Sequence, residues 1–87
     1  MDTAKPDIER AVRLVRDVAT ALVDEETGIS VAAFSGTECT VIELRTAPGQ
    51  VGQVIGKQGR ISEAIRILLN AHSAKVQHRF TLEILEH

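Results

Sequence analysis

The segment Val54-Ile55-Gly56-Lys57-Gln58-Gly59-Arg60-Ile61 places two glycines three residues apart between two apolar stretches. Before it, residues 51–55 have helical spacing over a very short length, and a longer amphipathic helical pattern begins at Arg60. A bare Gly-x-x-Gly is common by chance, so its position between two helices is what makes it informative. A turn of this kind exposes backbone N–H groups, and glycine lets another molecule approach the backbone closely.

The rest of the chain supplies one more helix and three strands. Residues 7–23 show helical spacing, and Asp7 is placed to cap the first turn. Residues 29–35 and 39–46 are rich in β-formers and are separated by a short polar turn, which predicts a β-hairpin. Residues 79–85 alternate again, with Phe80, Leu82 and Ile84 facing inward. In the helix that begins at Arg60, the predicted inward face comprises Ile61, Ala64, Ile65, Leu68, Ala71 and His72.

These elements predict an α+β fold in the order helix, strand, strand, short helix, helix, strand. Since the strands have one apolar face, the helices are expected to lie together on that face of a three-stranded sheet. The first two strands form a hairpin, so the last strand must run parallel to one of them, which makes the sheet mixed. We expect residues 1–6 to be a flexible N-terminus and residues 7–87 to form a single domain.

Composition narrows the class of protein. The 87 residues are 44% hydrophobic and 25% charged, as in an ordinary globular domain. Cys39 is the single cysteine, so no internal disulfide can form. No apolar run approaches the length of a membrane span, and the first residues lack a signal-peptide pattern. We therefore expect a cytoplasmic protein without membrane insertion.

The sequence offers no sign of catalysis or of a bound cofactor. Its three histidines and one cysteine lack the spacing of a zinc site. No nucleophile–base pair and no carboxylate pair is indicated by spacing. A P-loop also fits poorly, because Gln58 stands where a magnesium-binding Ser or Thr is required. We predict that the protein is not an enzyme and that it needs neither metal nor cofactor.

The net charge of −2 hides an uneven distribution. Residues 1–44 contain four basic and nine acidic residues, whereas residues 45–79 contain six basic residues and only one acidic residue, Glu63. The basic segment is centred on the glycine turn. A local field of one sign attracts a polyanion even when the whole molecule is slightly acidic.

The turn itself is suited to an anion. Gly56 and Gly59 allow close approach, Lys57 supplies a mobile cation, and Arg60 lies in a first helical turn, where the helix dipole favours an anion. Val54, Ile55 and Ile61 flank the turn. They are expected to pack the helices and, in the case of Ile55 and Ile61, to edge an apolar groove for bases.

Residues 54–61, followed by Ala64-Ile65-Arg66, resemble the KH domain, which has a Gly-x-x-Gly between two helices. The element order is similar to type II KH domains, with a core motif over about residues 39–86, and the chain resembles the small stand-alone bacterial proteins of the KhpA family. This resemblance implies binding of single-stranded RNA through about four nucleotides. The implied RNA-binding residues are Val54, Ile55, Gly56, Lys57, Gln58, Gly59, Arg60, Ile61 and Arg66.

The resemblance also implies a biological setting. It suggests a cytoplasmic RNA chaperone or post-transcriptional regulator that works with a larger KH protein of the KhpB (Jag) type. It further implies self-association and an influence on cell shape and cell wall organisation.

An alternative is a protein-interaction adaptor that uses the KH fold mainly for dimerisation. The apolar stripe of the first helix is wider than one core contact requires, because Ala11, Leu14 and Val18 extend it. The sequence therefore predicts a homodimer face at these three residues.

Overall fold

The computed structural model describes residues 7–23 and 28–87, so the N-terminal residues 1–6, which we expect to be flexible, lie outside the described part. The elements are α1 (Ile8–Leu22), β1 (Ser30–Ser35), β2 (Cys39–Thr46), α2 (Val51–Ile55), α3 (Arg60–Val76) and β3 (Arg79–Glu86). A 3₁₀ turn (Lys57–Gly59) joins α2 to α3. The predicted order and the predicted α+β class are confirmed.

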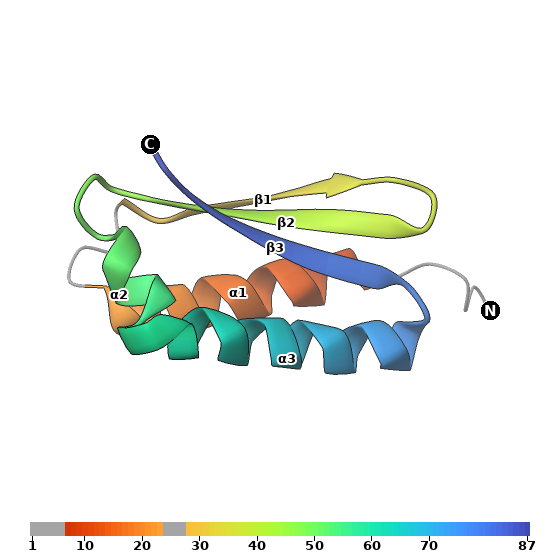
Figure 1. Ribbon diagram of the computed structural model, residues 1–87. Coiled ribbons are helices and arrows are strands. Elements are labelled where there is room, and N and C mark those ends of the chain that lie inside the picture. Colours follow the sequence, from red (N-terminus) through yellow and green to blue (C-terminus); the bar gives the residue numbers. More distant parts are fainter. Residues whose placement is uncertain (1–6, 24–27) are drawn as a thin grey trace.

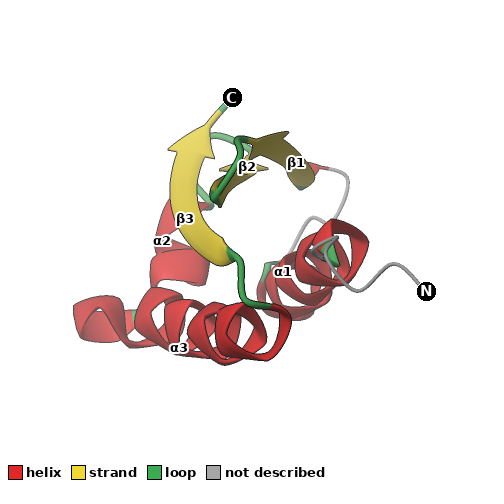
Figure 2. Ribbon diagram, turned by 90° about the vertical axis from the view of Figure 1, so that its right-hand side faces the viewer, coloured by secondary structure: helices red, strands yellow, loops and turns green. Residues whose placement is uncertain are grey.

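The described chain forms two layers, with α1 and α3 side by side beneath one face of the sheet (Figures 1 and 2). The strand order is β1-β2-β3, so β2 is central and β3 lies at an edge. β1 pairs antiparallel with β2, in a register that sets Ser30 opposite Arg45. β3 runs parallel to β2, with Cys39 opposite Arg79, which confirms the mixed sheet.

Alternation in the strands decides which face is covered. In β2 the side chains of Thr40, Ile42, Leu44 and Thr46 are buried, and the residues between them are partly exposed. In β3, Phe80 and Leu82 are buried in the same layer. These side chains pack against the helices, as the period of two predicts.

The first helix begins as predicted, because the Asp7 carboxylate accepts a hydrogen bond from the Arg10 backbone N–H at 3.1 Å. Ala11, Val15 and Ala19 of α1 are fully buried against the sheet and α3. Small side chains at two of these three positions allow the helix to lie close to its neighbours.

The inward face predicted for α3 is partly wrong. Ile65 is buried as expected, but its buried neighbours are Ser62 and Leu69, whereas Leu68 is 46% exposed. Ala64 and Ala71 are also exposed. The helix carries two apolar stripes with the same three- and four-residue spacing, and periodicity alone does not rank them. The stripe that faces the sheet admits Ser62, because its hydroxyl donates to the Gly59 carbonyl at 3.1 Å.

Candidate nucleic-acid interface

The glycine turn lies between α2 and α3, at the end of the molecule where β2 leads into α2 (Figure 1). Gly56 has φ 81° and ψ 172°, a region of the backbone map that is essentially restricted to glycine. A Cβ at this position would lie 2.8 Å from the Cβ of Ile61 and 3.0 Å from its backbone nitrogen. Both the conformation and the close approach of α3 therefore require glycine at position 56.

The second half of the turn is left-handed. Gln58 has φ 58° and Gly59 has φ 74°, and Gly59 is the N-cap of α3, with no side chain to accept from the helix N-terminus. Within the described residues, the backbone N–H groups of Lys57 and Gln58 have no hydrogen-bond partner. A helix start with unpaired N–H groups beside a left-handed turn is a typical site for an anion.

The side chains of the turn are disposed for a ligand. Lys57, Gln58 and Arg60 are exposed, and the Arg60 guanidinium donates to the Gln58 Oε1 at 3.4 Å. Ile55 is 37% exposed, and Ile61 is half-buried against the core. These five residues, which the sequence places at the site, come together at one end of α3.

Val54 does not belong with them. Its side chain is fully buried in the core and presents no surface to a ligand in this structure, and its contact with RNA stays a prediction. In a five-residue helix only one side can face the sheet, and Val54 occupies that side while Ile55 lies outside.

The outer edge of β3 lies beside α3. The Phe80 backbone N–H donates to the Ser73 hydroxyl at 3.0 Å, and the Leu82 carbonyl accepts from the Arg66 guanidinium at 3.3 Å. Both backbone groups therefore point away from β2. Arg66 lies about two turns of helix, or roughly 10 Å, from Gly59, which places the predicted residue further along the groove between α3 and β3.

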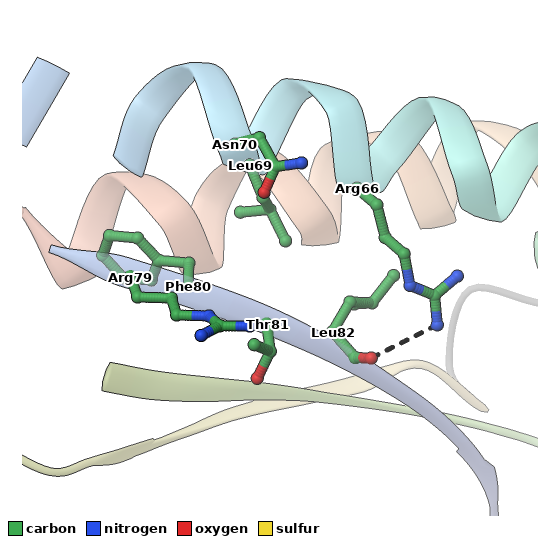
Figure 3. Close-up of a pocket in the computed structure, with 7 residues that line it drawn as sticks. All are labelled: Arg66, Leu69, Asn70, Arg79, Phe80, Thr81 and Leu82. Atoms are coloured by element: carbon green, nitrogen blue, oxygen red, sulfur yellow. Dashed lines mark hydrogen bonds between the residues drawn. The ribbon is translucent and has the colours of Figure 1, made fainter. Parts of the chain in front are cut away.

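Sequence reasoning missed three polar residues at this edge. Asn70, Arg79 and Thr81 line one pocket together with Arg66 (Figure 3). The only sequence signal was the position of Arg79 in the basic segment. Their meeting depends on how β3 is placed against α3, which the sequence pattern does not specify.

The cations of this side are not neutralised within the described residues. In the described part of the chain, Arg10 pairs with Asp7 at 3.0 Å and Arg45 pairs with Glu43 at 3.2 Å. None of the cations along the turn and the β3 edge has a carboxylate partner in the described part of the chain; they are Lys57, Arg60, Arg66 and Arg79. Four of the six cations of the basic segment therefore lie along the turn, α3 and the start of β3 without an ion pair in the described residues.

The first helix offers less surface than predicted. Ala11 is fully buried and offers no surface to a second copy, so a dimer face on α1 stays a prediction that this residue does not support. Leu14 and Val18 are partly buried and pack against the core. The most exposed large apolar side chains on the helices are instead Ile67 and Leu68 of α3, at 60% and 46%, whereas α1 exposes Leu22 at its end, at 38%.

No helix in the described residues has both the length and the apolar character to cross a membrane. No group of three or more metal-ligating side chains comes together in residues 7–23 and 28–87.

The order of elements and the Gly-x-x-Gly turn between α2 and α3 define a type II KH domain. The chain belongs to the KhpA/KhpB KH-domain family, whose model matches residues 12–84.

Proteins named RNA-binding protein KhpA are similar over most of their length. The chain is 45% identical to the one from Aquifex aeolicus over 73 residues, covering 84% of this chain and 92% of that one. It is 40% identical to the one from Borreliella burgdorferi over 75 residues, covering 86% and 92%.

Solved structures of Era share the fold at 20% sequence identity. One is a point variant of Aquifex aeolicus Era bound to GDP.AlF4-, with a TM-score of 0.58 over 88% of this chain and 30% of that one. The other is Era in complex with MgGDPNP and nucleotides of 16S ribosomal RNA, with a TM-score of 0.57 over 87% and 29%. The chain thus spans less than a third of either Era chain.

Proposed function

We propose that this protein binds single-stranded RNA and holds the backbone of about four nucleotides at Gly56-Lys57-Gln58-Gly59. The observation that carries the proposal is the pair of unpaired N–H groups, on Lys57 and Gln58, next to Gly56, where any other residue would be strained. Its relatives named RNA-binding protein KhpA support the same ligand.

The chemistry of the turn fits a phosphate. Unpaired N–H groups and the start of α3 supply fixed positive dipoles, and Lys57 and Arg60 add two mobile cations. The backbone contact positions the strand without reading its sequence. Ile55 and Ile61 then offer aliphatic surface to the bases. Stacking of bases on aromatic rings is a poorer explanation, because the chain contains two phenylalanines and no tyrosine or tryptophan.

The proposed role is binding rather than catalysis, as an RNA chaperone or post-transcriptional regulator in the cytoplasm. A single site for four nucleotides binds weakly, because few contacts must offset the ordering of a flexible strand. A second KH protein of the KhpB (Jag) type would raise the apparent affinity through effective concentration. By resemblance, we further propose that this assembly acts on cell shape and cell wall organisation.

The test is the double variant Lys57→Asp with Gln58→Asp. It places two carboxylates at the proposed phosphate position, and aspartate tolerates the left-handed backbone of residue 58. Fluorescence anisotropy with a labelled single-stranded RNA should show binding at least about tenfold weaker, which corresponds to ~1.4 kcal/mol.

The matched control is Arg13→Asp with Arg16→Asp, two exposed positions on α1. It changes the net charge even more, so it separates a local contact from a general charge effect. Unchanged RNA affinity in the turn variant, or an equal loss in both variants, would rule out the proposed site.

A second function, homodimerisation through α3, is favoured by the exposure of Ile67 and Leu68. Ala64 and Ala71 lie beside them on the exposed side, and together the four residues form an apolar surface one helix wide. A two-fold pairing of such helices buries each stripe against its copy.

Light scattering of the wild type, Leu68→Glu and Leu14→Glu distinguishes the two helices. We expect a dimer for the wild type and for Leu14→Glu, and a folded monomer for Leu68→Glu. A wild type that stays monomeric at high concentration would exclude dimerisation. If Leu14→Glu dissociates the dimer and Leu68→Glu does not, the interface lies on α1 and not on α3.

A further inference from the structure

The two edges of the sheet differ in how their backbone groups are satisfied. At the β3 edge, α3 supplies partners: the Ser73 hydroxyl accepts from the Phe80 N–H at 3.0 Å. The Arg66 guanidinium donates to the Leu82 carbonyl of the same edge at 3.3 Å. At the β1 edge, no side chain within residues 7–23 and 28–87 bonds to the strand backbone. α1 packs beneath both β1 and β2 (Figure 2), so the edge of β1 stays open within the described part of the chain.

The hairpin turn shows which backbone groups of β1 point outward. The Gly36 N–H donates to the Cys39 carbonyl at 2.7 Å, so these two residues form a hydrogen-bonded pair of the ladder. Such pairs recur at every second residue, and Ser30, Ala32 and Phe34 therefore also bond to β2. The residues between them direct their N–H and C=O groups away from β2. We call their N–H groups the outward amides; they belong to Val31, Ala33 and Ser35.

β1 has none of the features that usually protect an edge strand. Its sequence, Ser-Val-Ala-Ala-Phe-Ser, contains no charged residue and no proline. All six of its residues pair with β2 in an uninterrupted register, without a bulge. Charged side chains, prolines and bulges are the common means by which edges avoid pairing with another chain. An edge that lacks them is suited to pairing.

The side chains of β1 are complementary to a second copy of the same strand. Phe34 is 57% exposed on the outer face of the sheet, and Ala32 precedes it on that face. An antiparallel pairing that sets Ala33 opposite its own counterpart places each Phe34 ring beside the small Ala32 of the other copy. These two residues then form a non-hydrogen-bonded pair, in which side chains lie closest. In the same register the outward groups of Val31 meet those of Ser35, and no two like charges face each other.

We propose that β1 is a self-association edge, where two copies pair antiparallel about a two-fold axis at Ala33 and join their three-stranded sheets into one. The self-complementary register favours a second copy over an unrelated strand. The inference does not depend on RNA binding or on pairing through α3. In Figure 2, α2 and α3 lie on the side of β3, away from β1, so the contact leaves both of them free.

The contact is weak between isolated copies. One strand pair buries far less than the roughly 1,200 Å² of a stable interface, so it forms mainly at high protein concentration. Light scattering at ordinary concentration therefore reports the pairing of α3. Where both contacts form, two different two-fold axes on one chain join the copies into assemblies larger than a dimer.

Amide exchange with water tests the contact in the Leu68→Glu variant, which removes pairing through α3. The ¹⁵N-labelled protein is compared by nuclear magnetic resonance at about 0.05 and 1 mM, a range suited to a weak contact. We expect the outward amides to exchange at least about twofold more slowly at the higher concentration, because half or more of the copies are then paired. The amides of β1 that already bond to β2 should not change. Outward amides whose exchange is independent of concentration would overturn the proposal.

Two substitutions block the edge without removing a core contact. Ala32→Lys places a cation on the outer face opposite Glu43, which favours the fold and excludes the facing strand. Ala33→Pro removes one outward amide and no hydrogen bond to β2. Both should abolish the concentration dependence, whereas the control Thr81→Lys, with the same added charge on the outer face of β3, should keep it. Dependence that survives in both edge variants, or that Thr81→Lys also abolishes, would contradict the assignment to β1.

Disulfide trapping tests the register. Residues directly opposed in a non-hydrogen-bonded pair have Cα atoms about 4.5 Å apart, which is within the range of a disulfide. With Cys39→Ser in every chain, a mixture of Ala32→Cys and Phe34→Cys chains should oxidise mainly to the mixed dimer. Disulfides that form mainly between two Ala32→Cys chains would contradict the two-fold axis at Ala33.

Discussion

The two glycines of the turn have different tasks at the scale of single residues. Gly56 is constrained both by its backbone angles and by the side chain of Ile61, whereas a Cβ at Gly59 would meet only the Ser62 hydroxyl, at 3.9 Å. Position 56 therefore holds α2 against α3, and position 59 supplies a left-handed start to α3. The motif thus combines a packing constraint with a conformational one.

Alanine substitutions should separate these tasks. We expect Gly56→Ala to lower the free energy of unfolding by about 3 kcal/mol or more, because the Ile61 side chain must move as well as the backbone. Gly59→Ala should cost only about 1–2 kcal/mol, the penalty for a left-handed alanine. Urea denaturation followed by circular dichroism measures both. Equal losses in the two variants would contradict this division.

The elements were predictable from the sequence to different degrees. The alternation of β2 and β3 identified their buried faces correctly, since a strand has only two faces and one of them is apolar. In α3 the same reasoning failed, because Leu68 and Leu69 lie on adjacent apolar stripes with equal spacing. The pocket at Arg79 was also beyond prediction, since it depends on the position of β3 relative to α3 rather than on any local pattern.

The neighbouring leucines of α3 provide a matched test of the helix orientation. Leu69→Ala should cost about 2–5 kcal/mol, because it leaves a cavity in the core. Leu68→Ala should cost less than about 1 kcal/mol when measured at a concentration where the chain is monomeric. Urea unfolding of the two variants compares them directly, and a larger loss for Leu68→Ala would mean that the helix is rotated from the orientation described.

At the scale of the whole molecule, net charge is a poor guide to the ligand. The chain has a formal charge of −2, yet Lys57, Arg60, Arg66 and Arg79 lie along one side with no carboxylate partner in the described residues. A polyanion responds to that local field rather than to the sum. The small share of aromatic residues, 2%, points in the same direction, to a groove with aliphatic walls.

Salt dependence is the corresponding prediction. If two or three phosphates are contacted, the affinity for single-stranded RNA should fall roughly tenfold between about 50 and 200 mM monovalent salt. Titrations at several salt concentrations give the slope. An affinity that stays constant, or that rises with salt as the repulsion of an acidic protein would require, would argue against the local positive side as the binding surface.

Binding of RNA at the glycine turn is tested most directly by nuclear magnetic resonance. Uniformly ¹⁵N-labelled protein would be titrated with an unlabelled single-stranded RNA of eight nucleotides. We predict saturable shifts of the backbone amides of residues 56–61, largest at Lys57 and Gln58, with little change along α1. Saturable binding that leaves these amides unshifted and instead perturbs α1 or the β1–β2 hairpin would contradict the account.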